Sequence, residues 1–213
     1  MPLLLHRRSP SGAITGIWKL DEPVYQMKDM IKLRSEEEEI YATFVHENRR
    51  KQWLGIRLLL KEVLPDVALQ IEYDENEKPF LKDSTWKISI SHSRNKAAIL
   101  LHPRLACGID IEHMHARIEK VAEKFLCNDE LEFVQGKNFT QSLHVCWGIK
   151  EALYKMAGWK GMIFAEDMRI RPFTFSTRGT AEACICKGKK EDWFTLNFET
   201  VNDYILVTTI KQK

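Results

Sequence analysis

The sequence predicts an α+β fold of two lobes that form one structural unit. Strand-like and helix-like segments occur in both halves of the 213 residues, without the strict alternation that a doubly wound parallel sheet requires. No low-complexity linker and no repeat of fixed period divides the sequence. A chain of this length buries roughly 70% of its unfolded surface, so it can build a core without disulfides or a structural metal.

The first half is predicted to contain a strand, one long helix and then several strands. Residues 14–21 are strand-like and end at the Glu22-Pro23 break. Ser35 is a suitable helix cap, with Glu38 as its capping-box partner. Apolar residues at helical spacing continue this helix to Pro65. Period-two alternation predicts the following strands, over residues 67–73, 86–90 and 97–101, with a turn at 91–95.

The second half is predicted to begin with a strand over residues 107–112, followed by three helices. The helices cover residues 118–125, a segment that starts at Asn128-Asp129, and residues 142–157, where Gly158 is a plausible C′ residue. The remainder, from 162 to 210, is rich in strand patterns and ends with a strand at 204–210. We place the N-terminal lobe at residues 1–103 and the C-terminal lobe at 104–213.

The charge balance and hydropathy exclude several classes of protein. The 32 basic and 30 acidic residues leave a net charge of +2, whereas nucleic-acid binders carry a clear basic excess. The apolar runs fall far short of the ~20 residues that a membrane span needs. Leu3-Leu4-Leu5 is followed at once by basic residues, which is the wrong order for a signal peptide. We therefore expect a cytoplasmic protein that binds neither nucleic acid nor membrane.

The five cysteines also indicate an intracellular protein, because their number is odd and no paired CxxC element occurs. Cys184 and Cys186 alternate with Ala183 and Ile185. We interpret them as strand positions rather than as metal ligands.

Two carboxylates in Gly108-Ile109-Asp110-Ile111-Glu112 give the clearest indication of chemistry. Residues two apart on a strand project from the same face, so Asp110 and Glu112 should point together while the two isoleucines enter the core. Adjacent buried carboxylates need a cation, and Mg²⁺ takes oxygen ligands while it keeps open positions for phosphate. The alternative is an exposed edge strand with two solvated acids.

A helical segment from Trp147 to Lys155 carries a third acid beside lysines. Spacing of four residues stacks Trp147, Glu151 and Lys155 on one face, and Lys150 adds a second cation beside Glu151. The alternative is an ordinary surface ion pair worth a few tenths of a kcal/mol.

Three further segments offer contacts for an anion. Ser91 and His92 follow a hydrophobic strand, although a structural turn histidine fits equally well. Lys78-Pro79 places a lysine on a rigid corner, or forms only a hairpin corner. The basic stretch Arg49-Arg50-Lys51 is either a solvated helix face or an anion site.

Together these segments resemble the 4′-phosphopantetheinyl transferase superfamily, in its monomeric type that activates peptide synthetases and carrier proteins. The resemblance covers about half of the chain, from Arg49 to Gly158. It rests on four blocks that occur in the family's order and spacing. The blocks are Lys78-Pro79-Phe80-Leu81, Ile88-Ser89-Ile90-Ser91-His92-Ser93, Gly108-Ile109-Asp110-Ile111-Glu112 and Trp147-Gly148-Ile149-Lys150-Glu151-Ala152-Leu153-Tyr154-Lys155.

The resemblance implies two similar lobes related by a pseudo-twofold axis, with the active site in the cleft between them, so one chain acts as a pseudo-dimer and a monomer is expected. It implies Asp110, Glu112 and Glu151 as Mg²⁺ ligands. The residues implied to contact coenzyme A are Lys78, Ser91 and His92, one of Arg49, Arg50 and Lys51 near the 3′-phosphate, and Lys150 and Lys155 beside the pyrophosphate.

Two positions depart from the family pattern. Gly148 stands where the family more often has Ser, Thr or Cys, and Glu77 stands where a glycine commonly precedes the Lys-Pro pair. Both are small or turn positions that tolerate the change.

The implied reaction transfers 4′-phosphopantetheine from coenzyme A to a serine of an apo acyl or peptidyl carrier protein, the holo-acyl-carrier-protein synthase reaction. Glu151 is the expected general base, and Lys155 is expected to stabilise the departing 3′,5′-ADP.

Two other functions stay open. A metal-dependent nuclease or phosphodiesterase also gathers two acids and a lysine, but commonly with its Glu and Lys two apart on a strand. A non-catalytic coenzyme A or carrier-protein binding module would not need all four of Asp110, Glu112, Glu151 and Lys155.

Overall fold

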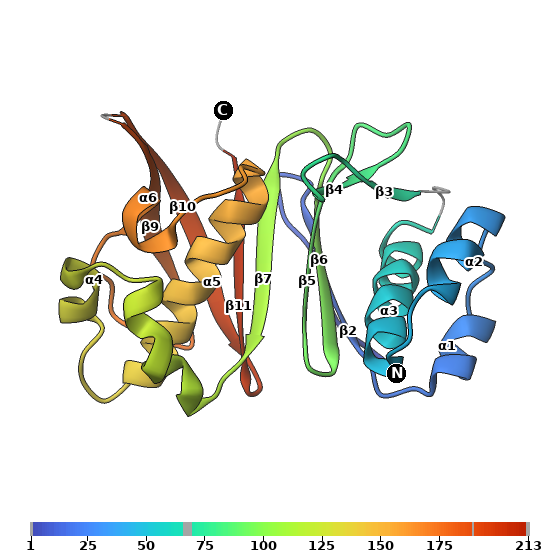
Figure 1. The fold of residues 1–213 in the computed structure, drawn as a ribbon, viewed down its shortest axis with the longest axis horizontal. Coiled ribbons are helices and arrows are strands. Elements are labelled where there is room, and N and C mark those ends of the chain that lie inside the picture. Colours follow the sequence, from blue (N-terminus) through green and yellow to red (C-terminus); the bar gives the residue numbers. More distant parts are fainter. Residues whose placement is uncertain (1, 66–69, 189, 212–213) are drawn as a thin grey trace.

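Two antiparallel β-sheets pack face to face at the centre of the molecule, and helices cover the outer face of each sheet (Figure 1). The computed structural model describes residues 2–65, 70–188 and 190–211. The layers therefore follow the order helix, sheet, sheet, helix. This arrangement is α+β, as the sequence predicts.

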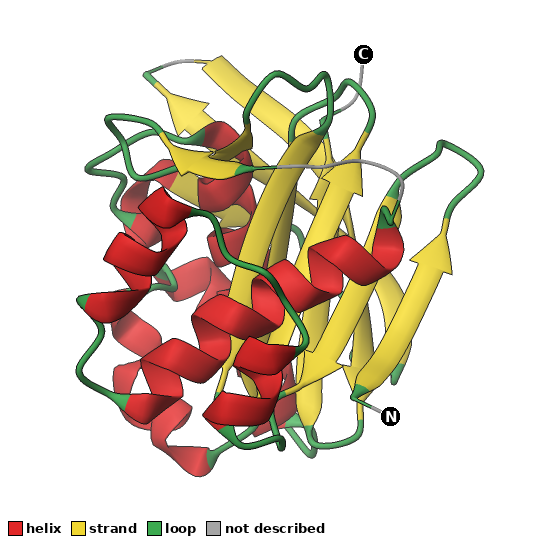
Figure 2. Ribbon diagram, turned by 90° about the vertical axis from the view of Figure 1, so that its right-hand side faces the viewer, coloured by secondary structure: helices red, strands yellow, loops and turns green. Residues whose placement is uncertain are grey.

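The N-terminal sheet has the strand order β1-β2-β6-β5, and its longest helix crosses the outer face (Figure 2). Helix α3 packs on β2 and β6, and α1 packs on α3. The strands are β1 (Leu3–Arg8), β2 (Ile14–Lys19), β5 (Lys87–Ser93) and β6 (Lys96–His102), and a separate pair is formed by β3 (Ile71–Tyr73) and β4 (Pro79–Leu81). The helices are α1 (Val24–Asp29), α2 (Ser35–Ala42) and α3 (Glu47–Val63).

The C-terminal sheet has the order β7-β11-β10-β9-β8, and helix α5 packs on β7 and β11. The strands are β7 (Cys107–His113), β8 (Met168–Ile170), β9 (Arg178–Lys187), β10 (Lys190–Val201) and β11 (Tyr204–Ile210). The helices are the 3₁₀ helix η1 (Ala116–Lys124), α4 (Asn128–Phe133), α5 (Phe139–Ala157) and α6 (Phe164–Asp167).

An apolar cluster between the two sheets holds them together. It includes Ile17 and Leu100 from the N-terminal sheet and Ile109, Ile111 and Leu206 from the C-terminal sheet. The inward position of Ile109 and Ile111 confirms the predicted alternation on β7, because it leaves Asp110 and Glu112 on the opposite face.

A row of serine hydroxyls joins the facing edges of the two sheets. Strands β5 and β7 belong to different sheets but lie side by side. The Oγ atoms of Ser89, Ser91 and Ser93 accept the backbone N–H groups of Ile109, Ile111 and His113 at 3.1, 3.2 and 3.2 Å. Serine side chains at period two thus satisfy the amides of an edge strand that would otherwise lack partners.

The predicted long helix is two helices, which corrects the sequence interpretation. Helix α2 ends at Ala42, because the Thr43 hydroxyl donates to the carbonyl of Ile40 at 2.7 Å. Arg50 Nε donates to the carbonyl of Phe44 at 2.8 Å, and α3 begins as a separate helix after His46. Side-chain donors therefore occupy carbonyl groups that a continuous helix would use.

The predicted cap of α2 is also displaced by one residue. Arg34 is the N-cap, and the carboxylate of Glu37, rather than that of Glu38, accepts its backbone N–H at 3.3 Å. Glu38 instead forms an ion pair with Lys28.

The predicted turn at residues 91–95 is shorter than expected. Strand β5 continues to Ser93, and the reversal occurs at Arg94, whose φ is 47°. This change places Ser91 and His92 on a strand rather than in a turn. It therefore excludes the alternative in which His92 is a structural turn histidine.

The other predicted elements hold with small changes at their ends. Helix α5 begins at Phe139, three residues before its predicted start, and ends before Gly158 in the left-handed conformation. The strand predicted at 67–73 is present at Ile71–Tyr73, and Val67 and Leu69 lie outside the described residues. Among the helices of the described residues, none combines the length and the apolar character needed to cross a membrane.

Candidate active site

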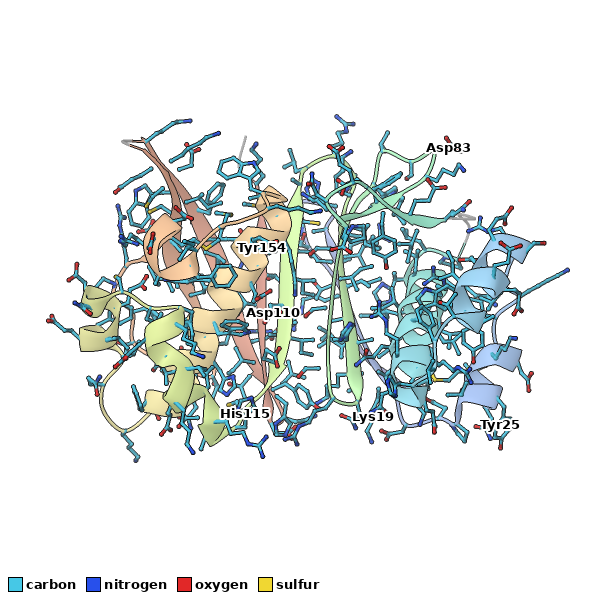
Figure 3. All side chains as sticks on the ribbon, in the orientation of Figure 1. Lys19, Tyr25, Asp83, Asp110, His115 and Tyr154 are labelled. Carbon is cyan, nitrogen blue, oxygen red and sulfur yellow. The ribbon has the colours of Figure 1, made fainter. Side chains whose placement is uncertain are left out.

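Asp110 lies near the centre of the molecule, on the face of β7 that α5 covers (Figure 3). Its side chain is 3% exposed, so the alternative of an edge strand with two solvated acids is excluded. Ser91 donates to Asp110 Oδ1 at 2.9 Å, and Ser93 donates to Glu112 Oε2 at 2.8 Å. The serines of β5 therefore bind the carboxylates of β7 as well as its amides.

Helix α5 brings Glu151 and Lys155 to the same place. Lys155 Nζ lies 2.7 Å from Asp110 Oδ1, 3.0 Å from Ser91 Oγ and 4.0 Å from Glu151 Oε2. The predicted i,i+4 pair on α5 is present, but it is not an ordinary surface pair, because the lysine binds a buried acid from another element. Three of the predicted site residues, from β5, β7 and α5, thus meet at one ammonium group.

Two glycines allow α5 to approach the strands this closely. A Cβ at Gly108 would lie 1.9 Å from the Ala152 carbonyl oxygen. A Cβ at Gly148 would lie 2.6 Å from Val207 Cγ2. The sequence Gly108-Ile109-Asp110 therefore combines the contact point for the helix with the carboxylate that the helix covers. Gly148 stands where a larger residue would displace Val207.

Burial raises the proton affinity of two carboxylates in this cluster. Burial, followed by the charge of Asp110, raises the pKa of Glu112 to about 7, against the lowering effect of the Ser93 hydrogen bond. Burial also raises the pKa of Glu151, and the Lys155 charge opposes this shift. A neighbouring cation would therefore stabilise the charged forms of both carboxylates.

The residues fit a hard divalent cation. Asp110 Oδ2 is buried and has no hydrogen-bond partner among the described residues, although the Oδ1 atom of the same group has two. Leaving a buried carboxylate oxygen unpartnered is costly. The carboxylates of Asp110, Glu112 and Glu151 do not all lie within 4.8 Å of one another, since the described residues contain one such group and it lies elsewhere. Metal binding by all three would therefore require a side-chain movement.

Lys78 reaches the end of α5 across the line between the sheets. Its Nζ donates to the Met156 carbonyl at 2.7 Å, and burial lowers its pKa. Its stem passes Gly158, where a Cβ would lie 2.9 Å from Lys78 Cδ. The left-handed backbone at position 158 favours glycine.

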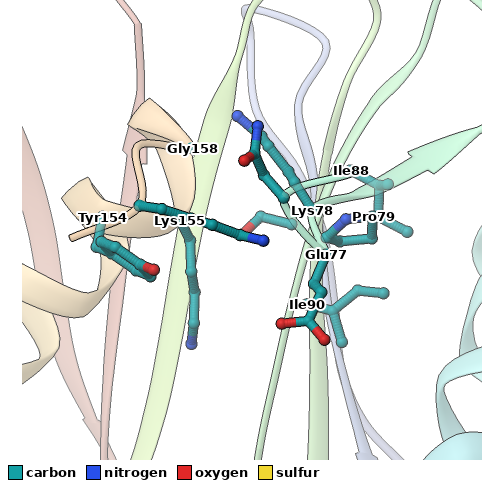
Figure 4. Close-up of a pocket in the computed structure, with 11 residues that line it drawn as sticks. Glu77, Lys78, Pro79, Ile88, Ile90, Tyr154, Lys155 and Gly158 are labelled. Carbon is teal, nitrogen blue, oxygen red and sulfur yellow. The ribbon is translucent and has the colours of Figure 1, made fainter. Parts of the chain in front are cut away.

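A cavity of about 100 Å³ lies between Lys78 and α5 (Figure 4). Tyr154, Lys155 and Gly158 form one side, and Lys78 and Ile88 contribute to the other. A second cavity of about 340 Å³ also has Lys78 and Ile88 in its lining. The predicted corner at Lys78-Pro79 therefore lines a cavity that extends to Lys155.

His92 connects this region to the basic stretch of α3. Its Nε2 lies 3.4 Å from the Arg49 guanidinium. Burial, and then the Arg49 charge, lower the pKa of His92. Of the three basic residues, Arg49 is therefore the one beside His92, while Arg50 stacks on Tyr41 and Lys51 pairs with Glu47.

Lys150 is not brought together with the other predicted residues. Its side chain is 0% exposed, and its Nζ lies 2.6 Å from Glu130 Oε2 and 3.0 Å from the Phe164 carbonyl. Burial lowers its pKa, against the opposing effect of Glu130. Adjacent residues on a helix point in different directions, so Lys150 does not face the acids as Glu151 does. Lys150 instead connects α5 to α4 and α6 through its hydrogen bonds to Glu130 and Phe164.

The sequence interpretation assigned no role to Tyr154, and among the serines of the segment 89–93 it selected only Ser91 as a site residue. The serine spacing Ser89, Ser91, Ser93 would have shown one face of a strand, had this segment been interpreted as a strand and not partly as a turn. Tyr154 had no comparable pattern, because its place in the cavity depends on how α5 is docked.

Comparison with known proteins shows which class of protein this chain is similar to. Residues 106–209 match the 4′-phosphopantetheinyl transferase superfamily. The resemblance seen in the motifs is confirmed, and the matched region carries Asp110, Glu112, Glu151 and Lys155.

A relative in Haemophilus influenzae, named "Putative 4′-phosphopantetheinyl transferase", is 30% identical over 139 residues. The match spans 60% of this chain and 57% of that protein, so the chain covers little more than half of the length of its curated relative.

Proposed function

We propose that this protein transfers the 4′-phosphopantetheine group of coenzyme A to a serine of an apo acyl or peptidyl carrier protein, in the presence of Mg²⁺, and releases 3′,5′-ADP. The observation that carries the proposal is the convergence of Asp110, Glu151 and Lys155 from two elements of the matched region. Family membership supports the transferase class and coenzyme A as the donor.

The proposed architecture is two lobes, residues 1–103 and 104–213, related by a pseudo-twofold axis, with the site in the cleft between them. One long helix on the outer face of each sheet supports this arrangement, α3 in one half and α5 in the other. We propose that one chain acts alone, because residues from both halves contribute to the site.

Asp110, Glu112 and Glu151 are the residues that would hold Mg²⁺. When bound, the ion would neutralise negative charge on the pyrophosphate. The unpartnered Asp110 Oδ2 and the raised pKa of Glu112 support this assignment, because both are relieved by a cation.

Charged side chains around the acids would hold coenzyme A. Lys78 lines the cavity beside α5 and also the second cavity, and Lys155 lines the first cavity and contacts Asp110. His92 and Arg49 form a further pair, which favours Arg49 over Arg50 and Lys51 for the 3′-phosphate. Lys150 is left out of this set, because Glu130 holds it inside the protein.

In the proposed reaction, the carrier serine oxygen attacks the β-phosphorus of coenzyme A. The new serine Oγ–phosphorus bond forms while the bond to the 3′,5′-ADP oxygen breaks. Glu151 takes the serine proton, directly or through a water, and its raised pKa suits that role. Lys155 stabilises the negative charge on the departing 3′,5′-ADP.

The test is incubation of the protein with coenzyme A, Mg²⁺ and apo carrier proteins of several classes, followed by intact mass measurement. A gain of one phosphopantetheine unit on a carrier is expected. Asp110→Ala and Glu151→Ala should abolish the gain, while Glu166→Ala, which removes an exposed carboxylate on α6, should leave it intact. Near-normal transfer by either site variant would contradict the proposal.

A further inference from the structure

A second group of metal-ligating side chains lies on the hairpin formed by β9 and β10. Cys184 and Cys186 are two apart on β9, and Glu191 of β10 is the cross-strand partner of Cys186. All three side chains therefore project from one face of the sheet. In the described part of the chain, this is the group of three Cys, His, Asp or Glu residues whose ligand atoms all lie within 4.8 Å of one another.

The spacing of the two sulfur atoms suits a tetrahedral metal ion. Cys184 Sγ and Cys186 Sγ are 3.7 Å apart, and both residues are free thiols. Two thiolates on one tetrahedral Zn²⁺, with Zn–S bonds of about 2.3 Å, stand about 3.8 Å apart. The strand thus already holds the sulfurs at the required separation.

The third ligand is oriented by a neighbouring indole. Trp193 Nε1 donates to Glu191 Oε2 at 3.1 Å, and Trp193 is itself the cross-strand partner of Cys184. The guanidinium of Arg171 stacks over the Trp193 ring at 4.1 Å. Metal-ligating carboxylates are typically positioned by such an outer hydrogen bond, and this one is supported by packing.

Burial decreases across the group from one side to the other. Cys184 is buried, Cys186 is half-buried and Glu191 is exposed. A bound ion would have two fixed sulfur ligands and an open side toward solvent.

We propose that Cys184, Cys186 and Glu191 bind a divalent cation of the Zn²⁺ class, with a fourth position open to water. Two thiolates select Zn²⁺ or Co²⁺ over Mg²⁺, so this site differs in chemistry from the all-carboxylate cluster at Asp110. The ion would cross-link β9 to β10 near their turn. The hairpin end also contacts the loop after α5, where Lys187 Nζ lies 4.7 Å from the Trp159 ring centre.

The test is titration of the reduced full-length protein with Co²⁺, followed by displacement with Zn²⁺. We expect a thiolate-to-cobalt charge-transfer band that saturates at one equivalent, disappears on addition of Zn²⁺ and persists in millimolar Mg²⁺. Zn²⁺ should also protect the half-buried Cys186 thiol from a thiol reagent and raise the melting temperature.

Variants separate this site from the other cysteines. Cys186→Ser is preferred to a change at the fully buried Cys184, and it should weaken Zn²⁺ binding by more than the ~10–100-fold that loss of an outer-shell partner costs. Trp193→Phe keeps the aromatic ring but loses the hydrogen bond to Glu191, so it should weaken binding by about 10-fold. Cys127→Ser changes a half-buried thiol outside the group and should bind normally. A native protein without the band while its thiols are reduced, or unchanged binding by Cys186→Ser, would overturn the proposal.

Discussion

The Lys155 ammonium lies 2.7 Å from Asp110 Oδ1, and this contact joins the catalytic candidates of α5 to those of β7. Asp110 is 3% exposed and Lys155 is 26% exposed, so the pair is closed on the strand side and open on the cavity side. The lysine therefore neutralises a buried acid and can still contact a ligand in the cavity.

Replacing Lys155 with Met should destabilise the protein and make its stability depend on Mg²⁺. The substitution leaves Asp110 buried without its cation, at a cost of about 2 kcal/mol. If Mg²⁺ binds at Asp110, it should restore part of that loss, so the melting temperature of Lys155→Met should rise more with Mg²⁺ than that of the native protein. Lys160→Met, which removes an exposed lysine beside the same cavity, is the control and should cost less than about 0.5 kcal/mol. Equal Mg²⁺ responses in all three proteins would argue against a cation at Asp110.

The free energy of unfolding should fall as the pH rises from about 4.5 to 7 because of Glu112. The pKa of this group is raised from 4.5 to about 7 on folding. In that window the folded state holds a proton that the unfolded state has lost, so the contribution of Glu112 is complete below pH 4.5 and disappears by pH 7. A tenfold change in proton affinity is worth about 1.4 kcal/mol, so the contribution is about 3 kcal/mol.

Urea denaturation across this pH range, compared between the native protein and Glu112→Gln, isolates the effect, since Gln does not titrate. The buried histidines contribute equally to both proteins and cancel in the difference. Saturating Mg²⁺ should flatten the native curve, because a bound cation holds Glu112 deprotonated. A difference curve that does not change with pH would show that Glu112 titrates normally.

Replacing Lys150 with Met should reduce stability by about 3–5 kcal/mol, the typical cost of breaking a buried ion pair by removing one partner. The cost arises at Glu130, which also accepts the backbone N–H groups of Cys127 and Ile170. The additional change Glu130→Gln should recover part of the loss, because it removes the uncompensated charge.

Activity at low temperature distinguishes this structural role from a role at the pyrophosphate. The folded Lys150→Met protein should have a KM for coenzyme A within a few-fold of the native value, whereas Lys155→Met should not. A large rise in KM for Lys150→Met with normal stability would return Lys150 to the binding site.

The two glycines at the α5 contact should respond differently to Ala. Gly108→Ala places a Cβ against the backbone carbonyl of Ala152, and no side-chain movement can relieve that clash. The free energy of unfolding should therefore fall by at least the ~1–3 kcal/mol that is typical of overpacking. Gly148→Ala meets the side chain of Val207. The double variant Gly148→Ala, Val207→Ala should therefore be more stable than Gly148→Ala alone. Chemical denaturation measures both, and a neutral Gly108→Ala would show that α5 can move away from β7 at little cost.

The local pattern predicted the elements wherever one face of an element decides its structure. Alternation of Ile109, Asp110, Ile111 and Glu112 predicted strand β7 and the side to which its acids point. Gly158 predicted the end of α5, because few other residues adopt a φ of 68°. The local pattern failed at residues 43–46, where the helix is interrupted. The side chains of Thr43 and Arg50 donate there to carbonyl groups that a continuous helix would use, and a hydropathy pattern does not record such hydrogen bonds.

The sequence by itself determined the family, the α+β class and the acidic and basic residues from which a site could be built, because short motifs record residue type and spacing. Only the tertiary structure decided which of those residues meet. Lys150 and Lys155 lie on different faces of α5, but the docking of the helix decided that Lys150 meets Glu130 and that Lys155 meets Asp110. The pairing of β9 with β10 likewise brings Glu191 to Cys186, two residues that the strand pattern alone did not join. Such contacts depend on the packing of separate elements, which a local sequence pattern does not contain.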